Sequence, residues 1–221
     1  MRKTIYHGSE KIVRTPGFGA GNAFNDFGLG FYCCEQAGPA AEWAVSYDRN
    51  GFVTEYTIET DGLRIVNLCS SQYCALHWLY VLQSFREFEN SSPLVHRAKE
   101  YINKNFAVDH QGCDCMIGWR ADNSCFALAQ DFLEGNLPYR SFSRALSASD
   151  SNRQFVLKSN RAFERISYAG FESALSVGHY PEAASRELRI LKEAKVPHAR
   201  DDLFIGKLIE EDVKAYDLRL R

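Results

Sequence analysis

The sequence lacks the long apolar runs of a membrane protein. No stretch of about 18 apolar residues occurs, so no membrane-spanning helix is expected. Arg2 and Lys3 stand near the N-terminus, but no apolar segment follows them as it would in a signal peptide. Low-complexity tracts and internal repeats of solenoid or propeller period are also absent. We therefore expect a cytoplasmic, globular protein with no membrane partner.

An excess of charge of one sign is missing as well. Lys and Arg together number 26 and Asp and Glu number 28, so the formal net charge is −2. This balance argues against a strongly basic nucleic-acid-binding surface. It favours neither protein nor nucleic acid as a macromolecular partner.

Paired cysteines with zinc-site spacing are absent, although the chain has seven cysteines. Cys33 and Cys34 are adjacent, and Cys113 and Cys115 are separated by a single residue. The odd number argues against a disulfide framework. No His and Asn follow at the spacing of a cysteine protease, so a thiol nucleophile is not favoured. We predict no metal site and expect most thiols to pack as small apolar groups.

The residues that are present suit one globular domain. The chain has 221 residues, of which 45% are hydrophobic and 13% aromatic, enough to build a sizeable core. We expect a single α+β domain over residues 1–221, with residues 171–221 as a helical C-terminal extension.

Hydrophobic periodicity and turn residues predict the local elements. Strands are expected at about 3–6, 52–59, 63–68, 113–119, 153–159 and 162–168, with 52–68 and 153–168 as two hairpins. Helices are expected at about 31–47, 70–87, 94–105, 122–135, 139–148 and 181–195. A glycine-rich loop at 14–30 separates the first strand from the first helix and lacks the Gly-x-Gly-x-x-Gly pattern of a Rossmann site.

Three short motifs stand out: YHGS at Tyr6–Ser9, DFGLGFYCCEQAGPAAEWA at Asp26–Ala44 and RQFVLKS at Arg153–Ser159. Singly, each has an ordinary structural explanation, such as a histidine at a strand end or a tight glycine turn. In this order, they resemble the ADP-ribosyltransferase superfamily, in its branch with a His-Tyr-Glu triad that includes diphtheria toxin and the poly(ADP-ribose) polymerases. The chain is also similar to bacterial proteins of unassigned function that carry YHGS, DFGxGFY and a RADDSYF-like motif, here RADNSCF at Arg120–Phe126. The resemblance covers residues 3–170.

The resemblance implies a split β-sandwich with helical insertions and NAD as the ADP-ribose donor. The catalytic residues would be His7, Tyr32 and Gln154. The residues expected to bind NAD would be Gly8, Ser9, Gly30, Trp43, Arg120 and Asp122.

Chemistry supports several of these roles. An imidazole can hydrogen-bond a ribose hydroxyl, and the backbone of Gly8 can approach the carboxamide closely. Tyr32 and Trp43 would enclose the cationic nicotinamide ring by stacking and cation–π attraction. Asp122 has a second interpretation, in which it caps the following helix and is held by an ion pair with Arg120.

Two positions depart from the family pattern. The third triad residue is Gln154 in place of Glu, and an amide cannot act as a base. The helix position that supplies a hydroxyl in the polymerases is Ala40. The resemblance therefore implies transfer of a single ADP-ribose to an intracellular macromolecule, as by the toxin of a toxin–antitoxin pair with a cognate antitoxin as partner. The alternatives are an NAD glycohydrolase, a catalytically weak module that binds NAD or ADP-ribose, and a structural protein.

Overall fold

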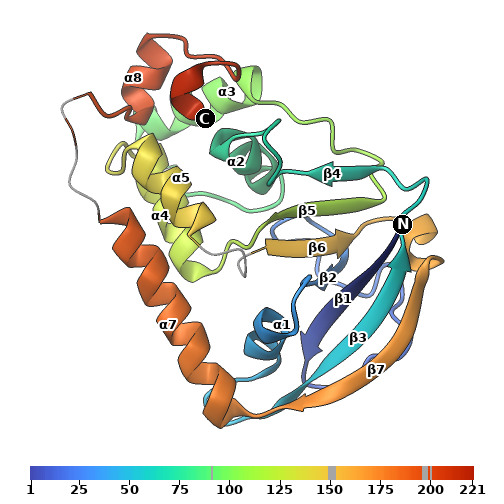
Figure 1. Ribbon diagram of the computed structural model, residues 1–221. Helices are drawn as coiled ribbons and strands as arrows, with labels where there is room; N and C mark the ends of the chain where they lie inside the picture. Colours follow the sequence, from blue (N-terminus) through green and yellow to red (C-terminus); the bar gives the residue numbers. More distant parts are fainter. Residues whose placement is uncertain (91, 149–152, 196–198, 200) are drawn as a thin grey trace.

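The computed structural model describes residues 1–90, 92–148, 153–195, 199 and 201–221. It contains two β-sheets and a set of helices (Figure 1). The strands are β1 (Arg2–Ser9), β2 (Phe31–Cys33), β3 (Gly51–Glu59), β4 (Ile65–Asn67), β5 (Cys115–Trp119), β6 (Arg153–Leu157) and β7 (Ile166–Ala174). The helices are α1 (Ala37–Ala44), α2 (Ala75–Gln83), α3 (Pro93–Asn105), α4 (Asn123–Leu133), α5 (Tyr139–Ser147), α6 (Asn160–Phe163), α7 (Ser176–Ala194) and α8 (Ile205–Glu210), followed by the 3-10 turn η2 (Leu218–Leu220).

The two sheets share one junction. The first sheet has the order β1-β3-β7 and is antiparallel throughout. The second has the order β2-β6-β5-β4, in which β5 and β4 are parallel and the other pairs antiparallel. Tyr6 and Cys34 exchange backbone hydrogen bonds of 2.8 and 2.7 Å, which link β1 to the end of β2. This link brings the YHGS motif beside the motif that begins with DFGLG, at Asp26–Ala44.

The second sheet is the middle layer of the fold. Phe155 and Leu157 of β6 face the first sheet and pack with Ile5 and Tyr56. Val156, between them, faces the opposite way into a core formed with the helices. Four successive residues of β6, 154–157, are buried, as expected for a strand that is covered on both faces. Each buried side chain of this size contributes about 1.5–3 kcal/mol relative to exposure.

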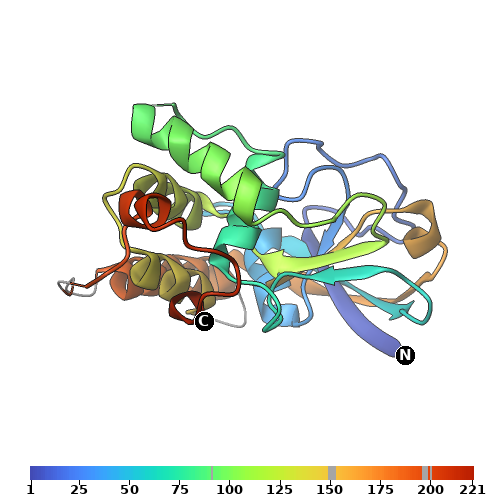
Figure 2. The same ribbon diagram turned by 90° about the horizontal axis from the view of Figure 1, so that it is seen from above.

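Helices cover the remaining faces. The core on the outer side of the second sheet gathers apolar side chains of α2, α3, α4, α5 and α8, with Trp78 fully buried among them. Helix α1 packs against β1 and β3 through Ala40, Ala41 and Ala44. Helix α7 leaves the end of β7 and runs past α1 to α5 (Figure 1). Seen from above, the segment between β1 and β2 forms a long arch beside the sheets (Figure 2).

The prediction of mixed α+β structure is confirmed, but both predicted hairpins are wrong. Strand β3 pairs with β1 and β7, whereas β4 pairs with β5 in the other sheet. The turn at Gly62, where φ is +74°, carries the chain from one sheet to the other. Strands β6 and β7 also lie in different sheets and are separated by α6, whose N-cap Ser159 accepts a hydrogen bond from the Ala162 N–H.

Three predicted helices have different bounds in the structure. Phe31–Cys33 is strand β2, and the helix begins only at Ala37. Helix α2 is shorter than predicted. Helix α7 begins at Ser176 and contains Pro181, where its start was expected. Residue 171, the expected start of the C-terminal extension, lies inside β7. Residues 196–198 and 200 of that extension lie outside the described part of the chain.

Other local predictions are confirmed. Strand β5 and helices α3, α4 and α5 lie where the sequence predicts them, and Gly135 ends α4 with a φ of +79°. Six of the seven cysteines are buried, in agreement with a packing role. Among the described helices, none combines the length and apolar character needed to cross a membrane.

Candidate functional site

A cavity of about 530 Å³ brings three of the sequence motifs together. Its walls come from β1, the arch before β2, β2 itself, α1 and β6. This volume is typical of small-molecule sites. Six of the nine predicted site residues line it: His7, Gly8, Gly30, Tyr32, Trp43 and Gln154. Ser9, Arg120 and Asp122 are not among the lining residues.

His7 lines the cavity and uses one ring nitrogen in a hydrogen bond to the chain. Its Nδ1 lies 2.8 Å from the carbonyl oxygen of Tyr32. A carbonyl only accepts, so Nδ1 carries the hydrogen and donates it. Burial lowers the pKa of His7, with the Tyr32 hydrogen bond opposing in smaller measure. The ring is therefore neutral near pH 7, and its Nε2 can accept a hydrogen bond from a hydroxyl.

Tyr32 uses its hydroxyl to close the preceding turn. The phenol oxygen donates to the carbonyl of Gly28 at 2.6 Å and accepts from the N–H of Phe27 at 3.0 Å. Burial raises the pKa of Tyr32 well above its ordinary value, so the phenol stays neutral. Gly28 has a φ of +71°, which favours glycine. With the hydroxyl engaged inside the chain, the ring is the part of Tyr32 that a ligand can contact.

The two other predicted glycines are required by packing. A Cβ on Gly8 would lie 1.7 Å from the carbonyl oxygen of Ala40, because α1 lies directly against β1. A Cβ on Gly30 would lie 2.6 Å from a methyl carbon of Val156. Neither glycine has to touch a ligand to be needed. Ser9, outside the cavity, donates its hydroxyl to the carbonyl of Lys11 at 2.7 Å.

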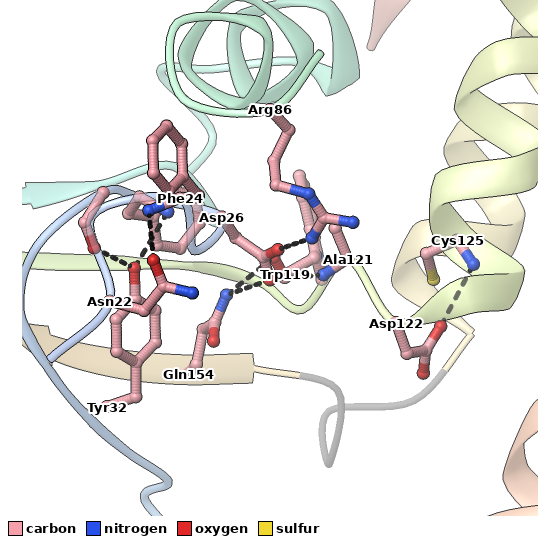
Figure 3. Close-up of polar contacts among 12 residues, drawn as sticks. Asn22, Phe24, Asp26, Tyr32, Arg86, Trp119, Ala121, Asp122, Cys125 and Gln154 are labelled. Carbon is pink, nitrogen blue, oxygen red and sulfur yellow. Dashed lines mark hydrogen bonds and ion pairs between the residues drawn. The ribbon is translucent and has the colours of Figure 1, made fainter. Parts of the chain in front are cut away.

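Gln154 is held by its amide nitrogen. The side chain projects from β6 and is 1% exposed. Its Nε2 donates to Asp26 Oδ2 at 3.0 Å and lies 3.4 Å from the carbonyl of Trp119 (Figure 3). Among the described residues, no group hydrogen-bonds its buried Oε1. Gln154 thus lines the cavity and carries a buried acceptor that has no partner among the described residues.

Asp26 is a candidate site residue that the sequence analysis missed. It is 8% exposed and lines the cavity. Its Oδ1 accepts from Arg86 Nη1 at 2.8 Å, and its Oδ2 accepts from the N–H of Ala121 at 2.8 Å as well as from Gln154 (Figure 3). Asp26 is the first residue of the DFGLG motif, but the motif alone does not reveal these distant donors.

Arg120 does not line the cavity but packs against the ring of Trp43, which does. Its guanidinium carbon lies 4.3 Å from the ring centroid of Trp43, a distance suited to cation–π attraction. Burial lowers the pKa of Arg120 to about 10, and the nearby charge of Arg186 acts in the same direction. The guanidinium remains charged near pH 7. Trp43 is thereby held with one face against Arg120 while it lines the cavity.

Asp122 caps a helix, as one of its two interpretations predicted. Its Oδ1 accepts from the N–H of Cys125 at 3.0 Å, at the start of α4 (Figure 3). The predicted ion pair with Arg120 is wrong, because the cation beside Asp122 is Arg186 of α7, at 3.5 Å. Arg186 also lies 2.9 Å from Glu42 of α1. These buried ion pairs connect α7 with α1 and with the start of α4, next to the cavity.

Within the described residues, no group of three or more His, Cys, Asp or Glu side chains is arranged to hold a metal ion.

Comparisons with known proteins identify the family of this chain but assign no activity to it. No curated protein and no solved structure matches the chain. A family described as a protein of unknown function (DUF3990) matches residues 3–168, which include every predicted site residue. The match extends over most of the chain, and the protein thus belongs to the DUF3990 family.

Proposed function

We propose that the cavity binds NAD and that the protein is a mono-ADP-ribosyltransferase acting on an intracellular macromolecule. The observation that carries the proposal is the convergence of His7, Tyr32, Trp43 and Gln154 on one cavity. These residues lie on separate elements, and the resemblance assigns them to a common site. Two sheets that pack face to face and meet at Tyr6 and Cys34 are compatible with the split β-sandwich of that superfamily.

The described groups can bind and orient the nicotinamide riboside portion of NAD. The Nε2 of His7 accepts from one ribose hydroxyl, and the Oε1 of Gln154 accepts from another. The rings of Tyr32 and Trp43 provide faces for the cationic nicotinamide. Such contacts hold the glycosidic bond in a desolvated position, where an oxocarbenium-like state can form.

The reaction then needs little from the protein beyond positioning. The C1′–N bond breaks, and nicotinamide leaves with the bonding electron pair. A nucleophilic atom of the acceptor forms the new bond to C1′ and releases its proton to solvent. Since Gln154 cannot take up that proton, the acceptor must carry a good nucleophile or its own base. If water is the acceptor, the same step is NAD hydrolysis.

The second candidate is a module that binds NAD without turning it over. Gln154 is the observation that favours this module, because Asp26, whose two oxygens already accept hydrogen bonds, is the only carboxylate among the described residues of the cavity wall.

The resemblance also supports an antitoxin as partner. An antitoxin would inhibit the transferase by covering the cavity or its acceptor side.

Doubly labelled NAD separates these functions. The chain is incubated with NAD carrying one label in the adenylate phosphate and another in nicotinamide, with cell protein and nucleic acid as acceptors. Adenylate label on a macromolecule, with nicotinamide released in equal amount, is the expected result. Free ADP-ribose alone would favour the glycohydrolase. NAD binding without nicotinamide release would favour the binding module, and absence of binding by calorimetry would overturn the proposal.

A matched pair of histidine variants makes the assay specific to the cavity. His7→Asn keeps a nitrogen donor for the Tyr32 carbonyl but removes the Nε2 acceptor. His96→Ala removes an exposed histidine of α3 that pairs with Glu100. Label transfer should be lost in the first variant and unchanged in the second.

A further inference from the structure

Asp26 is the point at which three separate parts of the chain meet. Its carboxylate accepts from Arg86, beyond the end of α2, from the backbone of Ala121, just before α4, and from Gln154 on β6 (Figure 3). These donors are 60, 95 and 128 residues away in the sequence. All of them are N–H groups, so a buried acceptor with two oxygens suits the position.

This arrangement determines which way the Gln154 amide points. One end of the amide faces two acceptors, Asp26 Oδ2 and the Trp119 carbonyl. The reverse orientation would bring three acceptor oxygens together with no hydrogen between them, so the nitrogen must occupy this end. The Oε1 atom is consequently directed away from Asp26. It is buried and unpartnered among the described residues, which is unfavourable until a donor reaches it.

We propose that Asp26 is a positioning residue, which fixes the Gln154 amide so that Oε1 accepts a hydrogen bond from a ribose hydroxyl of the bound dinucleotide. The inference rests on the proposed function for the identity of the ligand. The orientation of the amide rests on the hydrogen bonds alone. A glutamate at position 154 would supply both a negative charge and a hydrogen-bond acceptor. Here Asp26 carries the negative charge and Gln154 carries the fixed acceptor.

The positioning role predicts a specific change in ligand discrimination. NAD analogues that lack the 2′- or the 3′-hydroxyl of the nicotinamide ribose are compared with NAD by calorimetry. Wild type should bind each analogue about tenfold more weakly than NAD, because one analogue loses the hydrogen bond to His7 Nε2 and the other loses the hydrogen bond to Gln154 Oε1. In Asp26→Asn, the carboxamide no longer requires a donor from Gln154, and the amide can turn. The affinity ratio for the analogue without the Gln154 partner should then fall toward one, while the ratio for the other analogue stays at its wild-type value.

A second buried aspartate provides the control. Asp114 accepts from the backbone N–H of Arg64 and from the Ser159 hydroxyl, and it lies near Arg161, away from the cavity wall. Asp114→Asn should lower stability and leave the ratio at the wild-type value. A general loss of stability would not change the contribution of a single ligand hydroxyl, so a lower ratio in Asp26→Asn alone would indicate positioning. Retention of the wild-type ratio in folded Asp26→Asn would overturn the positioning role.

Nuclear magnetic resonance on the wild-type chain tests the amide directly, even if Asp26→Asn does not fold. The side-chain NH2 signals of Gln154, assigned by their loss in Gln154→Met, should exchange slowly with solvent. They should also show a nuclear Overhauser effect to the amide proton of Ala121, since both groups bond the same Oδ2. Rapid exchange without that effect would overturn the inference. Failure of wild type to bind NAD, with the signals as expected, would instead remove the proposed function and with it the ligand assigned to Oε1.

Discussion

A carboxylate introduced at position 154 is the sharpest test of the Asp26–Gln154 contact. From the family pattern alone, Gln154→Glu would restore the usual triad. In this structure, however, Nε2 lies only 3.0 Å from Asp26 Oδ2, so the substitution replaces a hydrogen bond with two carboxylates in contact. We therefore expect the single substitution to destabilise the protein at neutral pH.

The magnitude follows from the distance. Two unit charges about 4 Å apart interact by about 4 kcal/mol at an effective dielectric constant near 20. Arg86, 2.8 Å from Asp26 Oδ1, offsets part of the repulsion. The free energy of unfolding should therefore fall by about 2–4 kcal/mol at pH 8. Burial beside a negative charge raises the folded-state pKa of the introduced carboxyl, so the loss develops above its unfolded pKa of about 4.3 and shrinks as the pH falls toward that value.

Urea unfolding at pH 8 and pH 5 measures this effect. Gln83→Glu is the control, because Gln83 also donates through Nε2, at 2.6 Å, but to the neutral amide of Asn103. The double variant Asp26→Asn/Gln154→Glu restores a donor–acceptor pair and should recover part of the stability, although the Ala121 N–H loses its acceptor. Wild-type stability of Gln154→Glu at pH 8, or an equal loss at both pH values, would refute this reasoning.

Four further predictions concern the other walls of the cavity. His7→Asn should abolish nicotinamide release while changing the melting temperature little in differential scanning calorimetry; a large decrease in melting temperature would instead indicate a purely structural histidine. Trp43→Ala should weaken NAD binding by about 1–3 kcal/mol in calorimetric titration, and unchanged affinity would exclude stacking on this ring. Nicotinamide release should decline only below pH 6.5, because burial lowers the pKa of His7 from 6.5 and protonation removes the Nε2 acceptor. A histidine with a lowered pKa contributes stability above about pH 6.5. That stability is lost at lower pH, because the unfolded chain binds the proton first. His7→Asn should therefore reduce the pH dependence of the free energy of unfolding, measured from about pH 5 to 8.

Elements that depend on nearby residues could be predicted from the sequence. The Asp122 cap of α4 depends on an N–H three residues away, and the buried β5 on its own apolar run. Strand partners could not be predicted, because alternation along Phe52–Glu59 is the same whether the strand pairs with 63–68 or with β1 and β7. The three-residue strand β2 is also too short to show a period, and it leads within four residues into α1.

The candidate site divides in the same way. His7, Tyr32 and Gln154 were selected by motif, and the structure places all three at one cavity. Asp26 stood in one of the motifs, but nothing local distinguishes it from an aspartate that begins a turn. Its importance depends on three donors from distant segments, and only the fold brings them together.

Part of the chain beyond the family match supports the walls of the cavity without lining it. The match ends at residue 168, whereas Arg186 lies on α7. Its guanidinium contacts Glu42, the neighbour of Trp43, and Asp122, the neighbour of Ala121. It therefore holds α1, which carries the ring that lines the cavity, against the segment whose backbone N–H bonds Asp26. Removing one partner of a buried ion pair leaves an uncompensated charge, so this helix is part of the framework of the site and not only a surface addition.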